Sequence, residues 1–249
     1  MTDEAIPAAT LVVVRDRPSG PPDLLMVERA QGMAFAGGAL VFPGGRIDDA
    51  DTVLAARLGL GPDGGARIAA IRETIEETAV PIGLEPLPAP HQALAMQRDL
   101  ADGQDFAALL DRLGIVAAAA ALTTFARWVP KFHSSRRFDT LFFIAAAPEG
   151  EWEANVIAGE CTGAFWVSAA EAIDRDRAGM AKLIFPTRRN LERLAKHDSL
   201  AAILADAAAH PLDPITPWVE EMDGERFITI PDNLGYPVVR ERLDGLWRG

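Results

Sequence analysis

The segment from Arg72 to Glu77 holds one arginine and three glutamates, Glu73, Glu76 and Glu77. On an α-helix, which turns by about 100° per residue, these three carboxylates point to the same side. Carboxylates three or four positions apart repel one another, so each such pair destabilises a helix by roughly 0.2–0.5 kcal/mol. Clustered carboxylates suit hard cations such as Mg²⁺ or Mn²⁺. The spacing therefore indicates a divalent-metal site, and the solvated face of an amphipathic helix is the alternative.

The helix that carries these glutamates is predicted over residues 66–78. Its isoleucines, Ile68, Ile71 and Ile75, fall within about 60° of one another, on the opposite side from the carboxylates. We therefore expect the isoleucines to point into a core. Pro81 follows the helix and ends it, since proline has no amide hydrogen to donate.

A glycine-rich turn upstream is the second chemical feature. Residues 39–42 are strand-like and lead into Pro43, Gly44 and Gly45. Two adjacent glycines after a strand let the backbone turn where another group approaches closely. Such a strand end also frees backbone carbonyls, which are oxygen donors of the kind that hard cations prefer. The turn and the glutamates together favour a cation site.

Strands and helices alternate along the rest of the chain, with no internal repeat. Short β-branched and aromatic runs predict strands, and periodic apolar residues predict helices. Strands are expected at about 11–14, 24–27, 125–129, 137–144 and 164–167, and further helices at about 92–113, after a capping box at 168–171, and at 187–209. This order predicts a layered α/β fold in one domain over residues 1–249, with a helical elaboration at about 92–121 and a C-terminal extension at about 211–249 that wraps the body.

The composition excludes several classes of protein. Of the 249 residues, 49% are hydrophobic and 24% are charged, a balance that excludes a disordered chain. Lys and Arg number 24 against 36 Asp and Glu, so the formal net charge is −12. Such a surface repels nucleic-acid polymers and anionic membranes. A small anionic substrate would therefore need local arginines or a bound cation.

One cysteine, Cys161, excludes an internal disulfide and a cysteine-based zinc cluster. The acidic residues 1–4 are unlike a signal peptide, and no stretch reaches the roughly 18 apolar residues of a membrane span. These features predict a cytoplasmic protein without membrane contact. The oligomeric state is left open, with a homodimer among the alternatives.

The glutamate segment and the glycine turn together resemble the Nudix box, whose pattern is Gly-x5-Glu-x7-Arg-Glu-U-x-Glu-Glu-x-Gly-U, with U an aliphatic residue. Here Gly45-x5-Asp51 is followed by the matching run at 72–80. The chain departs from the pattern at three positions. Asp51 replaces the first glutamate, Thr74 the first aliphatic residue and Ala79 the last glycine.

The box, residues 45–80, is also interrupted. Twenty residues separate Asp51 from Arg72, 13 more than the seven of the pattern, and we place an insertion at about 52–66. This looks like the subgroup of Nudix hydrolases typified by a mammalian peroxisomal coenzyme A diphosphatase, which carries an insertion here. The resemblance covers roughly residues 8–195. Two roles for the insertion stay open: it shapes the substrate pocket, or it lengthens a surface turn.

The resemblance implies a Nudix α/β/α sandwich around a mixed β-sheet. It also implies an Mg²⁺- or Mn²⁺-dependent diphosphatase acting on a small nucleoside diphosphate derivative. Coenzyme A or acyl-CoA is the first candidate substrate, and NADH, ADP-ribose and nucleotide sugars are alternatives. A function of another class is a non-catalytic nucleotide-binding module that acts as a sensor or interaction surface.

The resemblance also assigns residues to roles. Metal ligands would be the three glutamates and a carbonyl of the turn, Gly44 or Gly45, while Arg72 orients a carboxylate. The general base is a box glutamate or Glu160 on a later loop, for which a surface acid is the alternative. The candidates for substrate binding are Arg29, Arg46, Arg137 and Phe42. Arg127 and Arg136 are candidates for further phosphate contacts. For each of these arginines, a surface ion pair is the alternative. Arg29 is the nearest candidate for the arginine of the coenzyme A signature, because Ala34 occupies the usual position.

Overall fold

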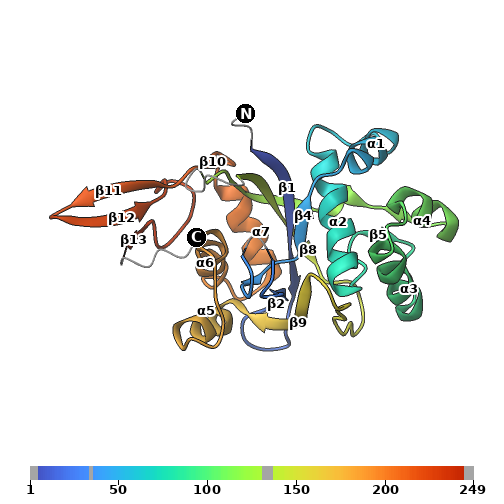
Figure 1. Ribbon diagram of the computed structural model, residues 1–249, viewed down its shortest axis with the longest axis horizontal. Helices are drawn as coiled ribbons and strands as arrows, with labels where there is room; N and C mark the ends of the chain where they lie inside the picture. Colours follow the sequence, from blue (N-terminus) through green and yellow to red (C-terminus); the bar gives the residue numbers. More distant parts are fainter. Residues whose placement is uncertain (1–4, 34–35, 131–136, 244–249) are drawn as a thin grey trace.

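A computed structural model describes residues 5–33, 36–130 and 137–243 of the chain. Its centre is an eight-stranded mixed sheet with helices on both faces (Figure 1). The strands are β1 Ile6–Arg15, β2 Asp23–Arg29, β3 Leu40–Val41, β4 Gly44–Arg46, β7 Thr123–Trp128, β8 Phe138–Ala146, β9 Cys161–Ser168 and β10 Pro214–Ile215. Strand β1 pairs in parallel with β8 and antiparallel with β4, and β2 pairs antiparallel with β9.

Alternate residues of β1 divide the apolar core between the two faces of the sheet. The helices are α1 Asp49–Arg57, α2 Gly64–Thr78, α3 Pro90–Ala101, α4 Phe106–Leu113, α5 Ala169–Arg177, α6 Phe185–Leu194 and α7 Leu200–Ala209. Leu11 and Val13 pack in a first cluster with α1 to α4. Val12 and Val14 pack in a second cluster with α5, α6 and α7. The predicted α/β/α sandwich is therefore confirmed.

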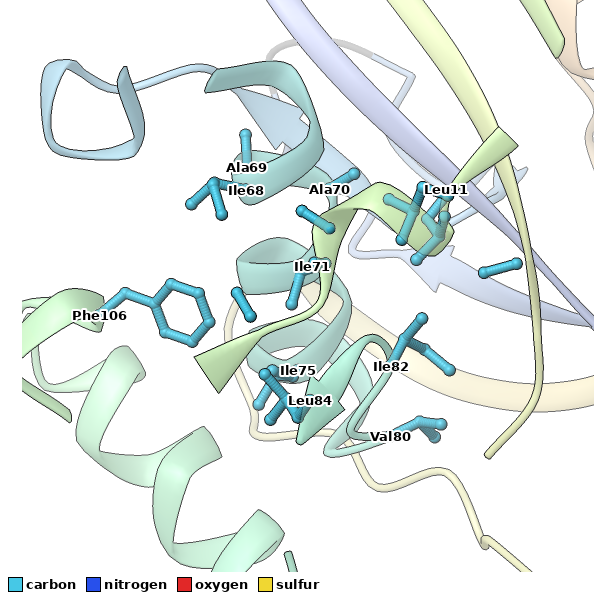
Figure 2. Close-up of a cluster of buried hydrophobic side chains, with 14 of the residues drawn as sticks. Leu11, Ile68, Ala69, Ala70, Ile71, Ile75, Val80, Ile82, Leu84 and Phe106 are labelled. Atoms are coloured by element: carbon cyan, nitrogen blue, oxygen red, sulfur yellow. The ribbon is translucent and has the colours of Figure 1, made fainter. Parts of the chain in front are cut away.

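The apolar side of α2 forms the centre of the first cluster (Figure 2). Ile68, Ile71 and Ile75 are completely buried, as their spacing predicts. Thr74 is buried beside them, at the position where the box pattern has an aliphatic residue. Its hydroxyl donates a hydrogen bond of 2.7 Å to the carbonyl of Ala70, so this polar atom is satisfied inside the core.

The box insertion is mostly helical. It contains most of α1 and a turn over residues 58–63, after which α2 begins at Gly64. Leu54 and Ala55 of α1 are buried in the first cluster. At the outer end, the guanidinium of Arg57 contacts the carboxylate of Asp111 on α4 at 2.8 and 3.1 Å. The insertion is thus a packed element and not merely a longer surface turn.

Two helices predicted from periodicity are each divided in the structure. The stretch at 92–113 contains α3 and α4, and the stretch at 187–209 contains α6 and α7. The side chain of Asp105 caps the first turn of α4, and that of Ser199 caps α7. The prediction was wrong here because the apolar period continues across both breaks, while the caps end one helix and start the next.

The predicted C-terminal wrap is instead a small antiparallel sheet of β11 Trp218–Met222, β12 Glu225–Thr229 and β13 Arg240–Arg242. It extends from the body on the side away from α1 to α4 (Figure 1). Ile228 and Ile230 anchor it in the second cluster. Two short strands, β5 Leu84–Glu85 and β6 Val116–Ala117, pair with each other, and β6 contacts α4. Among the described residues, no helix has the length and apolar character needed to cross a membrane.

Candidate active site

The polar side of α2 lies against the glycine turn at β4. The amide of Gly44 donates a hydrogen bond of 3.0 Å to Oε2 of Glu77. A Cβ atom at Gly45 would collide with the carboxylate of Glu73, so a larger residue there would displace that carboxylate. The two features that the sequence suggested would act together are therefore adjacent in space.

Arg72 is the centre of an ion-pair network. Its Nε and Nη2 atoms each lie 2.9 Å from an oxygen of Asp51, and Nη1 lies 2.9 Å from Glu73 and 3.4 Å from Glu76. Nη2 also donates to the backbone carbonyl of Arg46 at 3.1 Å. The guanidinium thereby joins the first acidic position of the box to its glutamates. Burial by itself would lower the pKa of Arg72, but the side-chain hydrogen bond to Asp51 and the charges of Glu73 and Asp51 outweigh it and raise that pKa.

The side of α2 that holds the glutamates is not a simple solvated face. The side chain of Glu77 is 6% exposed, that of Glu73 16% and that of Glu76 36%. Burial raises the pKa of all three, to about 7 for Glu73 and to about 8 for Glu77. Repulsion from neighbouring carboxylates adds to these pKa shifts, and Arg72 opposes them at Glu73 and Glu76. Without a cation, this arrangement concentrates more negative charge than one arginine offsets.

Glu77 has two further neighbours from other strands. Nη1 of Arg29, at the end of β2, lies 4.0 Å from Oε1, and Sγ of Cys161, at the start of β9, lies 3.7 Å from the same atom. Burial and the charge of Glu77 raise the pKa of the Cys161 thiol to about 12. The thiol is therefore neutral and donates its hydrogen to the carboxylate. Cys161 is buried, and it touches a box glutamate.

Glu160 lies beside this cluster. Its backbone carbonyl accepts a hydrogen bond of 2.8 Å from the amide of Ala30, next to Arg29. Its side chain is exposed, and its charge adds to the factors that raise the pKa of Glu76. The sequence candidate for a base outside the box thus shares an electrostatic environment with the box glutamates.

The four candidates for substrate binding are in different surroundings. Arg29 lies at the cluster, and Arg46 is exposed next to Arg72. Arg137 lies just before β8, where its carbonyl accepts a hydrogen bond from the amide of Ile6. Phe42 is only 3% exposed and belongs to the second core cluster, so its ring is not available to a ligand. That assignment is corrected: the aromatic ring is part of the core.

Arg127 and Arg136 are the two further candidates for phosphate contacts. The guanidinium of Arg127 is already paired with Asp139 on the neighbouring strand, with an Nε to Oδ1 distance of 2.8 Å. Arg136 and Ala34 lie outside the described residues. Arg127 therefore acts as the cross-strand partner of an acid, the alternative given for each of these arginines.

The donor atoms suit a hard cation, but the carboxylates do not converge on one point. Within the described part of the chain, no three His, Cys, Asp or Glu side chains are arranged to hold a metal ion. The contacts explain why. Arg72 occupies oxygens of Glu73 and Glu76, while Glu77 is turned toward Gly44. The residues fit such an ion in chemical type and in charge, and a cation would take over the role that Arg72 partly fills.

A cavity of about 300 Å³ lies between the insertion and the helical elaboration. Leu54 and Leu58 of the insertion line one side, and Leu110 and Ile115 line another. None of its lining residues is a box glutamate. The inserted helix therefore shapes a hollow, but on the side of α1 that packs toward α4.

Two residues near the site were missed by the sequence analysis. Gln97 on α3 donates to the backbone carbonyl of Glu76 and exchanges hydrogen bonds with Asn155. Nothing in the sequence marked this pair, because its members are 58 positions apart. The local signal is a glutamine on a predicted helix whose neighbours three and four positions away, such as Ala93 and Leu100, are apolar.

Comparison with known proteins supports the same class. No family model matches the chain. A crystal structure of a NUDIX hydrolase from Alicyclobacillus acidocaldarius aligns with a TM-score of 0.70 and 29% identity, over 81% of this chain and 96% of that one. The layered fold, the box residues and this likeness make the chain a member of the Nudix hydrolase superfamily.

The chain also resembles particular curated proteins. It is 27% identical over 261 residues to the human protein named Acyl-coenzyme A diphosphatase NUDT19, covering 81% of this chain and 69% of that protein. The same figures describe its likeness to the NUDT19 protein of Gallus gallus. The predicted enzyme class, a Nudix diphosphatase, is thereby confirmed.

Proposed function

We propose that the chain is a divalent-metal-dependent Nudix hydrolase that cleaves the diphosphate linkage of a nucleoside diphosphate derivative, with coenzyme A or an acyl-CoA as first candidate. The observation that carries the proposal is the packing of the segment Arg72–Glu77 against the Gly44–Gly45 turn, with Asp51 joined to Arg72 across the insertion. The names of the relatives support the choice of substrate.

The hydrolysis forms a bond between a water oxygen and one phosphorus, and it breaks the bond from that phosphorus to the bridging oxygen. Glu73, Glu76 and Glu77, with a carbonyl of Gly44, are the proposed ligands of Mg²⁺ or Mn²⁺. When bound, such an ion neutralises phosphate charge and lowers the pKa of a coordinated water. Glu160 is the proposed base, and its carboxylate takes the proton of the attacking water.

Arginines near the cluster are the proposed phosphate contacts. Arg29 is half-buried beside Glu77, where a guanidinium forms strong hydrogen bonds to an anion. Arg46 and Arg137 are the other proposed contacts. Local cations of this kind are needed because the protein as a whole carries a net charge of −12.

The substrate is tested with a panel of compounds. The purified protein is incubated with coenzyme A, an acyl-CoA, NADH, ADP-ribose and a nucleotide sugar, each with Mg²⁺, with Mn²⁺ and with a chelator. We expect coenzyme A or its acyl derivative to give two phosphomonoester products in the presence of metal. Preferred turnover of another member would change the substrate assignment. Binding without turnover of any member would favour the non-catalytic nucleotide-binding module.

The site is tested with three variants. Glu76→Gln is expected to abolish metal-dependent turnover, because it removes one charged ligand oxygen from the cluster. Glu160→Gln is expected to lower kcat about 100-fold, the lower limit for loss of a general base, at unchanged metal affinity. Glu151→Gln, an exposed acid on the same loop, is the matched control and keeps the wild-type rate. A normal rate in Glu76→Gln would refute the proposed ligand set.

A further inference from the structure

Gln97 forms a buried junction between three parts of the chain. Its side chain is completely buried on α3. Nε2 donates to the backbone carbonyls of Glu76, at 3.1 Å, and of Asn155, at 2.8 Å. Oε1 accepts a hydrogen bond of 2.6 Å from Nδ2 of Asn155. Every polar atom of the amide is therefore used, and α3 is tied both to α2 and to the segment that contains Asn155.

The junction closes the C-terminal end of α2. The last four carbonyls of a helix have no partner within it and need one from elsewhere. Gln97 satisfies the carbonyl of Glu76, and the backbone amide of Asn155 satisfies that of Thr78 at 2.9 Å. The carbonyls lie on the same helical turn as the Glu76 and Glu77 side chains. The junction therefore fixes the end of the helix from which the glutamates project.

The segment tied down by Asn155 also leads to Glu160. Residues 147–160, between β8 and β9, form no helix or strand apart from one bridge next to β9. Such a segment has few internal hydrogen bonds and depends on outside contacts for its path. Asn155 fixes its middle, and the carbonyl of Glu160 fixes its end on Ala30. Without the Gln97 contacts, the segment five positions before Glu160 would keep only the backbone hydrogen bond from Asn155 to Thr78 as its tie to α2.

We propose that Gln97 and Asn155 are positioning residues that hold the loop 147–160 against the end of α2 and so set the place of Glu160 relative to Glu76. This inference rests on the proposed function, because it assigns Glu160 a role in turnover. Neither residue touches the substrate in this proposal. They act through a loop and a helix end, and a displacement of about 1 Å at a base is enough to cost up to 100-fold in rate.

The test uses two variants of the full-length protein. Gln97→Met keeps the side-chain length but cannot donate to either carbonyl, and Met96→Leu, at the buried neighbouring position of α3, is its control. Asn155→Ala removes the side-chain hydrogen bond to Oε1 of Gln97 and keeps the backbone contacts of residue 155. The position is exposed, so we expect the fold to be retained, and Glu153→Ala is its control. We expect both junction variants to lower kcat about 10- to 100-fold at unchanged Mn²⁺ affinity, and both controls to keep the wild-type kcat.

A double-mutant cycle of Gln97→Met with Glu160→Gln separates an effect on the position of Glu160 from a general disturbance of the site. If the junction acts through Glu160, then Gln97→Met causes no further loss of kcat once Glu160 is replaced. Losses that multiply in the double variant, or a wild-type kcat in both junction variants, would overturn the inference. A wild-type kcat in Glu160→Gln alone would also overturn it, and would leave the diphosphatase function in place.

Hydrogen exchange tests the holding of the loop without reference to turnover. We expect faster exchange of the backbone amide of residue 155, which donates to the carbonyl of Thr78, in both junction variants and unchanged exchange in the two controls. If the wild-type protein hydrolyses no member of the substrate panel, the proposed function fails, whereas unchanged loop exchange in the variants shows that the junction does not hold the loop.

Discussion

At the scale of single residues, Asp51 shows how one side chain can complete a motif across an insertion. Its carboxylate is 2% exposed, makes two hydrogen bonds of 2.9 Å to Arg72 and accepts a third from the amide of Asp48. The capping of α1 and the binding of Arg72 use the same group. The shorter side chain is sufficient because the start of α1 brings the backbone close to Arg72.

Replacement of Asp51 by alanine is expected to lower the free energy of unfolding by about 3 kcal/mol. The change leaves the largely buried Arg72 without its bidentate partner, and breaking a buried pair on one side is costly. Asp49→Ala, in the exposed first turn of the same helix, is the control and costs less than about 1 kcal/mol. Urea denaturation at neutral pH measures both, and equal losses would contradict the prediction.

Tyr236, the single tyrosine of the chain, gives a pH-dependent prediction. It is buried with its hydroxyl bonded to Asn190, and burial raises its pKa from 10 to about 12. Between these two values the unfolded chain releases the phenol proton and the folded chain keeps it. The free energy of unfolding therefore falls as the pH rises through this interval. Tyrosinate absorbance should titrate near pH 12 in the folded protein and near pH 10 in denaturant, and a single midpoint near 10 would refute the burial argument.

At the scale of elements, α2 joins the core to the candidate site. One side is fixed by the isoleucines in the first cluster (Figure 2). The other side presents the glutamates to β4. The helix ends at Ala79, whose φ of 57° is in the left-handed region that favours glycine. This is the position at which the box pattern has glycine. The local backbone thus keeps the geometry of the motif although the residue differs.

Ala79→Gly is expected to raise the free energy of unfolding by about 0.5 kcal/mol. Relief of the left-handed strain gains about 1–2 kcal/mol, and loss of a buried methyl group offsets part of that gain. Ala70→Gly in the middle of α2 is the matched control and should lower the free energy by at least about 1 kcal/mol. Thermal unfolding of the two variants is expected to shift in opposite directions, and shifts in the same direction would contradict the strain argument.

At the scale of the whole molecule, the sheet separates two apolar clusters that have different roles. The first lies under α1 to α4 and supports the glutamates, and the second lies under α5 to α7 and receives the C-terminal strands. Ile228 of β12 is 1% exposed in the second cluster, while Val219, its partner on β11, is 40% exposed. The projecting sheet is therefore attached to the body through its base.

Ile228→Ala is expected to lower the free energy of unfolding by about 2–4 kcal/mol, with a single cooperative transition, because it creates a cavity in the second cluster. Val219→Ala, across the same strand pair, should change it by less than about 1 kcal/mol, since an exposed side chain loses few contacts. Denaturation curves followed by fluorescence and by circular dichroism should coincide for both. Separate transitions would show that the C-terminal sheet unfolds independently of the body.

The sequence by itself determined the layered fold class, the helix with its apolar side and the candidate residues of the box. These follow from local spacing: isoleucines and glutamates on one helix repeat with the helical period, and paired glycines permit a close turn. The periodicity of apolar and charged residues follows directly from the order of residues, so it predicts these elements without a structure. The same reading failed where caps divided two apolar stretches into four helices.

Only the tertiary structure decided which distant groups meet. The pairing of Asp51 with Arg72, the contact of Cys161 with Glu77 and the Gln97 junction join residues 21, 84 and 58 positions apart. It also placed Phe42 in the core. Burial and long-range contacts depend on how strands and helices pack, and no local pattern specifies that packing. The spacing of the glutamates thus predicted the kind of chemistry, while the fold decided how exposed each carboxylate is and what holds it in place.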